Sequence, residues 1–149
     1  MKMLMAMINL ATEAHSEQFD KGGFPYILHP LAVRNICLLG GADEELQCIA
    51  LGHDLIEDTY VTETALRNAG FSERVISGIR CMTKLPGESI EDYQSKVLSN
   101  IDACKCKMAD LTHNSDLRRL KGVTDKDIAR VGYYARFYDT ISKHLNSLS

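Results

Sequence analysis

The spacing of hydrophobic and polar residues is helical along most of the chain, and no extended run of alternating β-branched residues indicates a strand. Apolar positions three and four residues apart are typical of helices that cover a core with one face. The pattern predicts an all-α fold, a helical bundle of about eight helices in a single domain over residues 1–149. The expected helices span residues 2–19, 30–40, 43–57, 62–70, 72–82, 88–99, 101–119 and 124–146.

Glycine, proline and capping residues mark the boundaries between these helices. The run Gly22-Gly23-Phe24-Pro25 separates the first helix from the second, and Gly40-Gly41 ends the second. Asp43 is the expected N-cap of the third helix. Thr124 and Asp127 have the spacing of a capping box at the start of the last helix.

The helix expected over residues 43–57 is apolar on nearly all sides, which predicts an interior position. At about 100° per residue, one stripe of this helix still contains an imidazole and a carboxylate, and two more carboxylates, Asp54 and Asp58, flank it. The stripe consists of Leu46, Ala50, His53 and Glu57. Buried charges are costly unless they are paired, so this pattern indicates a bound metal ion.

Composition and charge place the chain among ordinary globular proteins, with 45% hydrophobic and 25% charged residues in a length of 149. The net charge of −3 provides no positive field for nucleic acid or an anionic membrane. No segment approaches the roughly 18 apolar residues of a membrane span, and the N-terminal stretch is expected to be a helix rather than a signal peptide. We expect a cytoplasmic protein with neither nucleic acid nor membrane as a partner.

The five cysteines fall within expected helices. Cys104 and Cys106 have the spacing of half a zinc site, but no second pair of cysteine or histidine residues matches it. Reduced and mostly buried thiols explain the set better.

Four residues from three separate segments of the sequence could hold a divalent metal: His29, His53, Asp54 and Asp110. Two imidazoles with two carboxylates suit Mn²⁺, Fe²⁺ or Zn²⁺, and such a site lowers the pKa of an attacking water. Glu57 and Asp58, one turn further on, could act as general base and acid.

Each candidate has a structural alternative. His29 alone could be a core histidine, His53 and Asp54 a buried capping pair, and Asp110 an interior carboxylate paired with a lysine. We expect structural roles for His15 and His113.

Four segments of the chain resemble one known family. AHSEQFDKGGFPYILHPLAV, LGHDLIEDT, TKL and KMADLTHN occur in this order, within residues 5–145. They are similar to the HD-type hydrolase domain of the RelA/SpoT proteins and their small stand-alone alarmone hydrolase relatives. The resemblance implies an all-helical HD bundle that hydrolyses the 3′-pyrophosphate of guanosine tetra- or pentaphosphate, (p)ppGpp, giving GDP or GTP and pyrophosphate. The chain is expected to degrade the alarmone and not to make it.

The same resemblance assigns roles to individual residues. It implies that the four metal candidates bind a single Mn²⁺ and that Glu57 and Asp58 form the acid/base pair. It also implies contacts with the guanine nucleotide, from Lys21, Lys84, Asn114 and Tyr134.

One departure from the family lies just after Asp110. Long family members have Arg-Leu-His-Asn followed by Met-Arg, where this chain has residues 111–114, Leu-Thr-His-Asn, followed by Ser115 and Asp116. Two positive charges are thus absent, and Asp116 adds a negative one. Arg118 and Arg119, one turn later, could replace the missing charges or lie in solvent. Two other functions therefore stay open, an HD phosphohydrolase for another nucleotide, such as the 2′-phosphate of NADPH, and a non-catalytic nucleotide-sensing module. The oligomeric state is open as well.

Overall fold

The computed structural model describes all residues, 1–149, and its regular structure is helical, with no β-strand beyond one isolated bridge between Phe19 and Pro25. The expected all-α fold is confirmed. The α-helices are α1 (Lys2–Ala14), α2 (Leu28–Leu39), α3 (Glu44–Gly52), α4 (Leu55–Asp58), α5 (Glu63–Asn68), α6 (Glu73–Met82), α7 (Ile90–Leu98), α8 (Ile101–Asn114) and α9 (Asp125–Ser147), with a 3₁₀ turn, η1 (Leu117–Arg119), before the last.

Side-chain caps begin several of these helices, as the sequence predicted. Asp43 accepts a hydrogen bond from the backbone N–H of Leu46 at 3.0 Å, at the start of α3. Thr124 and Asp127 form the expected capping box at the start of α9. Each cap satisfies N–H groups that have no partner inside the helix.

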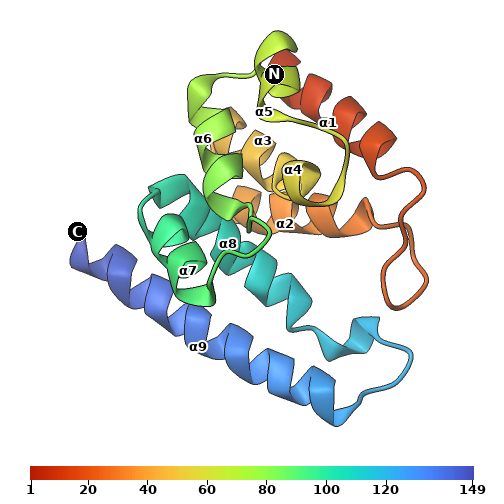
Figure 1. Cartoon of the computed structure of the whole chain (residues 1–149), viewed down its shortest axis with the longest axis vertical. Helices are drawn as coiled ribbons and strands as arrows, with labels where there is room; N and C mark the ends of the chain where they lie inside the picture. The colour runs from red at the N-terminus through yellow and green to blue at the C-terminus, as the bar shows by residue number, and fades with distance from the viewer.

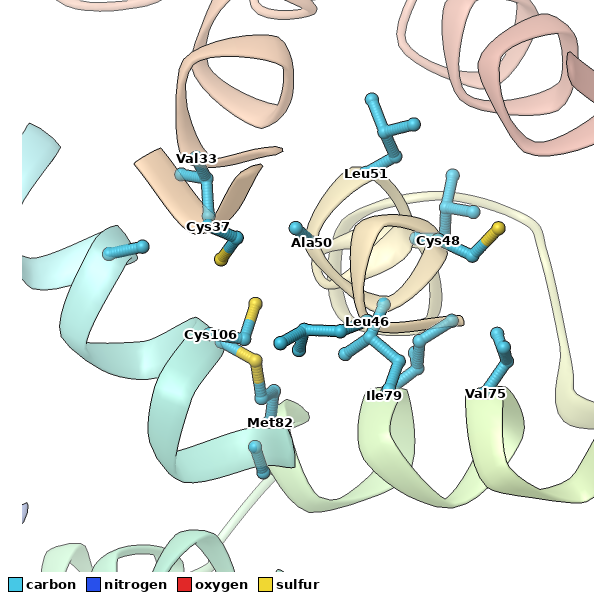
Figure 2. Packing of buried hydrophobic residues seen from close by; sticks show 14 of the residues in the cluster. Val33, Cys37, Leu46, Cys48, Ala50, Leu51, Val75, Ile79, Met82 and Cys106 are labelled. Carbon is cyan, nitrogen blue, oxygen red and sulfur yellow. The ribbon is translucent and has the colours of Figure 1, made fainter. Parts of the chain in front are cut away.

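Helix α3 lies at the centre of the bundle and packs against α1, α2 and α6 (Figure 1). The side chains from Cys48 to Leu51 are fully buried. Figure 2 shows α3 enclosed by apolar residues from α2, α6 and α8, with the sulfur atoms of Cys37 and Cys106 directed toward each other. All five cysteines are free thiols. No helix is long and apolar enough to cross a membrane.

Two predicted helices are too long at their C-terminal ends. The helix predicted over residues 2–19 ends at Ala14 in the structure. The chain then turns so that the backbone N–H of Gln18 donates to the carbonyl of His15. The window 101–119 ends at Asn114. There Asp116 accepts hydrogen bonds from the backbone N–H and guanidinium of Arg118, because short polar side chains compete with the helical pattern.

The window 43–57 is two helices, α3 and α4, with His53 and Asp54 between them. The His53 ring makes a hydrogen bond of 2.7 Å through Nδ1 to the Ala50 carbonyl. Asp54 has φ −101° and ψ 0°, in the bridge region. The predicted continuous helix is therefore wrong at the two residues of greatest chemical interest.

Candidate active site

The break between α3 and α4 brings the side chains of His53 and Asp54 together. Neighbouring residues of a continuous helix point about 100° apart and do not face each other. Here Nε2 of His53 lies 3.1 Å from Oδ2 of Asp54. The break thus supplies two adjacent donor atoms from consecutive residues.

Two other helices bring His29 and Asp110 to the same place. His29 is in the first turn of α2 and Asp110 is in α8, and both are buried. Oδ1 of Asp110 lies 2.9 Å from Nε2 of His29 and 3.3 Å from Nε2 of His53. The structure therefore places all four predicted metal ligands in one cluster.

The donor atoms of this cluster fit a metal ion. Nε2 of His53 is fully buried but has no hydrogen-bond partner, which is costly for a polar atom. Donor atoms of His29, His53 and Asp54 lie within 4.8 Å of one another. Asp110 contacts both histidines, so a fourth donor is adjacent. Two imidazole nitrogens and two carboxylates form a suitable set for a borderline or hard divalent ion.

Both histidine rings are oriented by their other nitrogen. Nδ1 of His53 donates to the Ala50 carbonyl, and Nδ1 of His29 lies 2.8 Å from Nδ1 of His113, whose ring stacks on that of His29. Burial and the Arg119 cation lower the pKa of His113 to about 4. A neutral His113 can share a proton with His29, so His113 positions a candidate ligand. The sequence predicted a structural role for His113, and its contact with the His29 ring is consistent with orienting that ring.

Each of the two carboxylates has a partner outside the cluster of four candidate ligands. Tyr26 donates its hydroxyl hydrogen to Oδ2 of Asp54. Lys107 donates to Oδ2 of Asp110 at 2.8 Å, so the lysine partner considered for Asp110 exists beside the two histidines. The spacing from Lys107 to Asp110 is a signal for such a pair on a helix. No sequence spacing indicated the contact from Tyr26.

Charge balance keeps Asp54 and Asp110 ionised. Burial raises the pKa of Asp54, but the adjacent His53 outweighs burial and lowers this pKa to about 2. For Asp110, burial is again opposed, first by Lys107 and then by the histidines, and the pKa lies well below its usual value. Both groups are therefore carboxylates at neutral pH.

Glu57 and Asp58 lie at the outer edge of this cluster, and both are exposed. The prediction that Glu57 belongs to a buried stripe, with Asp58 on its flank, is wrong, because α4 leads to the surface within one turn. Their carboxylate oxygens still lie within 4.8 Å of that of Asp54. Burial, the largest influence on each, raises the pKa of Glu57 and of Asp58. Both are placed to exchange protons with solvent beside the cluster.

The TKL segment meets the cluster through its backbone. The N–H of Lys84 donates to Oε1 of Glu57 at 2.6 Å. The Lys84 side chain is exposed and does not line the cavity next to the cluster. Its predicted nucleotide contact stays a prediction, and its visible role is to orient Glu57.

A cavity of about 430 Å³ opens beside His29 and Tyr26. Three of the four residues predicted to contact the nucleotide line it, Lys21, Asn114 and Tyr134. Two further cations, Arg119 and Arg130, also line the cavity. The loop between α1 and α2, the turn η1 and the first half of α9 form its walls, so the cavity joins segments that are distant in sequence (Figure 1).

His15 is buried under this loop. Its Nδ1 lies 2.7 Å from Oε1 of Gln18, whose amide group in turn donates to the carbonyl of Asp58. The ring also contacts Tyr26, with centroids 5.0 Å apart. Its Nε2, like that of His53, is buried without a hydrogen-bond partner, and the structural role expected for His15 stays a prediction.

Comparisons with known proteins place the chain in a family. No family model matches the chain. A guanosine-3′,5′-bis(diphosphate) 3′-pyrophosphohydrolase of Haemophilus influenzae is 35% identical over 116 residues, covering 70% of this chain and 17% of that protein. The bifunctional (p)ppGpp synthase/hydrolase SpoT of Escherichia coli is 32% identical over 124 residues, covering 76% and 18%. The chain belongs to the RelA/SpoT-type HD-domain family.

A solved structure shares the fold. It is described as a metazoan ortholog of SpoT that hydrolyses ppGpp, and it superposes with a TM-score of 0.78 over 95% of this chain and 85% of that one, at 22% identity. The RelA/SpoT-type chain spans about a sixth of the length of the curated relatives that it matches. Those relatives also include a GTP pyrophosphokinase of Myxococcus xanthus, 30% identical over 134 residues, so their names cover both synthesis and hydrolysis.

Proposed function

We propose that this RelA/SpoT-type domain is a metal-dependent hydrolase that removes the 3′-pyrophosphate of guanosine tetra- or pentaphosphate. The observation that carries the proposal is the cluster of His29, His53, Asp54 and Asp110, with its unpartnered His53 nitrogen. Through His29 this cluster adjoins a cavity whose lining includes three cations and three carboxylates: Lys21, Arg119, Arg130, Asp20, Asp116 and Asp127. The pyrophosphohydrolase and SpoT relatives, and the ppGpp-hydrolysing structural neighbour, support the choice of substrate. Free cysteines suit the reducing cytoplasm, where we expect the protein to act.

The metal in this proposal is Mn²⁺, held by His29, His53, Asp54 and Asp110. Such an ion would supply a Lewis acid that polarises a phosphoryl oxygen and lowers the pKa of the attacking water. The chain's own contribution is a fixed set of donors. His113, Ala50, Tyr26 and Lys107 orient them before any ion arrives.

Glu57 and Asp58 would carry the protons. Glu57 is held by the Lys84 backbone N–H, and its raised pKa brings it closer to neutrality, where a general base works best. Asp58, beside it, has its backbone tied to Gln18 and could return a proton to the leaving pyrophosphate. The exposure of both groups allows them to exchange protons with bulk water between turnovers.

The proposal predicts that Asp54→Ala and Glu57→Gln fail in different ways. Asp54→Ala should lose the metal, because a carboxylate donor is gone. Glu57→Gln should retain the metal and hydrolyse guanosine tetraphosphate about 10²–10⁴-fold more slowly, as expected for loss of a general base. Metal content by elemental analysis and product release with guanosine tetraphosphate and NADPH would measure both effects.

Glu91→Gln is the matched control, because Glu91 is an exposed carboxylate in the first turn of α7, away from the cluster. It should behave as the wild type. Equal metal loss in Asp54→Ala and Glu57→Gln would show that Glu57 is a ligand. Release of orthophosphate from NADPH, without pyrophosphate from guanosine tetraphosphate, would assign the cavity to another nucleotide.

A further inference from the structure

Arg119 has an unusual arrangement of partners. It lies in η1, just after α8, and its side chain is 24% exposed. Its Nη1 donates to the His113 carbonyl at 3.0 Å and lies 3.4 Å from Oδ1 of Asn114. Nε and Nη2 make no hydrogen bond, although Nη2 lies 3.7 Å from Oδ2 of Asp20. One side of the guanidinium is therefore fixed, and the other has unused donors.

Three other arginines show what this unused side does when a partner is present. In Arg67, Arg74 and Arg118, Nε and Nη2 bind the two oxygens of one carboxylate at distances of 2.6–3.2 Å. This planar pair of donors matches a carboxylate or a phosphate. Arg119 lines the cavity and has no such anion.

Asn114 connects Arg119 to the candidate metal cluster. Its amide nitrogen donates to Oδ1 of Asp110 at 3.1 Å, and its amide oxygen accepts from Arg119. The loop between α1 and α2 also lies close to Arg119. A methyl group added at Gly22 would lie 2.4 Å from the Arg119 carbonyl oxygen, so only glycine permits this approach. Arg119 is thus held in a set position between the cluster and the loop.

Arg118 supplies the contrast within the same turn. Its side chain is 91% exposed and is paired with Asp116, and it does not line the cavity. This pairing also lowers the pKa of Asp116 to about 2 and balances the negative charge that stands where long family members have arginine. Of the two arginines considered as replacements for that charge, only Arg119 faces the cavity.

We propose that Arg119 binds a phosphate group of the nucleotide through Nε and Nη2, and so determines the preference of this domain for phosphorylated ligands. This inference rests on the proposed function and names the residue that holds the phosphate. The phosphate could belong to the 5′-diphosphate that is retained or to the pyrophosphate that is released. In either case, Asp20 competes with it for Nη2.

Binding of GDP and of inorganic pyrophosphate, the two products of the proposed reaction, to Mn²⁺-loaded protein, measured by calorimetry, tests the proposal without turnover. Arg119→Gln should weaken binding of one or both ligands about 10- to 100-fold, as expected for a lost charged hydrogen bond. Arg119→Lys keeps the charge but loses the planar pair, so it should be intermediate. Arg136→Gln, at an exposed arginine of α9 that does not line the cavity, is the matched control and should stay within about twofold of the wild type. The ligand that loses affinity identifies the phosphate.

Asp20→Asn separates binding from a structural role. Asn keeps an oxygen to accept from the backbone N–H groups of Gly22 and Phe24, but it removes the competing charge. If Asp20 competes with the phosphate for Nη2, Asp20→Asn should tighten anion binding severalfold. If Asp20 only holds Arg119 in position, Asp20→Asn should weaken anion binding, as Arg119→Gln does.

Three results would overturn the proposal: equal affinities in Arg119→Gln and Arg136→Gln, weaker binding in Asp20→Asn, or no binding of either anion to the wild type. A parallel assay with guanosine tetraphosphate keeps the two claims distinct. Loss of GDP or pyrophosphate binding in Arg119→Gln, without hydrolysis by the wild type, would overturn the proposed reaction and support the role of Arg119.

Discussion

At the scale of single residues, each candidate ligand has a second partner that fixes its orientation. The pairs are His29 with His113, His53 with Ala50, Asp54 with Tyr26, and Asp110 with Lys107. The four candidate ligands were selected from their residue types and spacing, together with the family resemblance, and the structure brings them into one cluster. Most of their partners could not, because ring orientation and hydroxyl direction depend on how helices from distant parts of the chain pack.

Tyr26→Phe tests such a partner. The change removes the hydroxyl that donates to Asp54 and leaves the ring in place. Because partners of ligands orient them, we expect affinity for Mn²⁺ to fall about 10- to 100-fold, while the unfolding midpoint changes little. Metal titration measures the effect. Tyr138→Phe, at an exposed tyrosine of α9 without a side-chain hydrogen bond, is the control. Equal metal affinities in the two variants would contradict a positioning role.

At the scale of elements, the boundary between α3 and α4 shows a limit of pattern-based prediction. The apolar period continues through Leu55 and Ile56, so the sequence predicts one helix. Asp54 leaves the helical region, and the His53 ring bonds to a carbonyl of α3. These are local polar contacts, which hydrophobic periodicity does not report. Caps are different, because Asp43 and Thr124 act on N–H groups three residues away and were predictable.

Close packing of α3 on α6 requires a small residue at Gly78. A Cβ atom there would lie 2.4 Å from Cδ1 of Ile49, in the fully buried part of α3. We expect Gly78→Ala to lower the free energy of unfolding by about 1–3 kcal/mol, the usual cost of overpacking. Urea unfolding measures this change.

Gly132→Ala is the control for that substitution. Gly132 is also helical, in α9, but a methyl group there would contact nothing. Alanine should therefore raise the free energy of unfolding by about 0.5–1 kcal/mol through helix propensity. Stabilisation in both variants would show that Ile49 can move away at low cost.

At the scale of the whole molecule, the sequence predicted the all-α bundle, and the structure confirms it. The cavity was only partly predictable. Lys21, Asn114 and Tyr134 come from three separate segments and meet at it, whereas Lys84 lies elsewhere. Arg130 was not singled out as a cation of the cavity, because its place depends on how α9 packs against α8.

Global stability should depend on the metal. The cluster contains buried carboxylates and an unpartnered nitrogen that an ion would satisfy only in the folded state. At a free Mn²⁺ concentration 100 times Kd, folding should gain about 2.7 kcal/mol. Tm should rise by several degrees and return on addition of a chelator, as measured by calorimetry. Asp54→Ala should show no such rise. A Tm rise of equal size in that variant would place the stabilising ion elsewhere.

The Lys107–Asp110 pair has a consequence for how two ligands bind together. With both histidines neutral, the form that binds a metal, Asp54 and Asp110 bring two negative charges to the buried cluster and Lys107 returns one positive charge, which leaves a net charge of −1. A divalent ion would make the net charge of this cluster positive. The cluster would then attract the phosphate groups that it otherwise repels. Metal and nucleotide would therefore each raise the affinity for the other by the same factor, a reciprocity required by thermodynamic linkage.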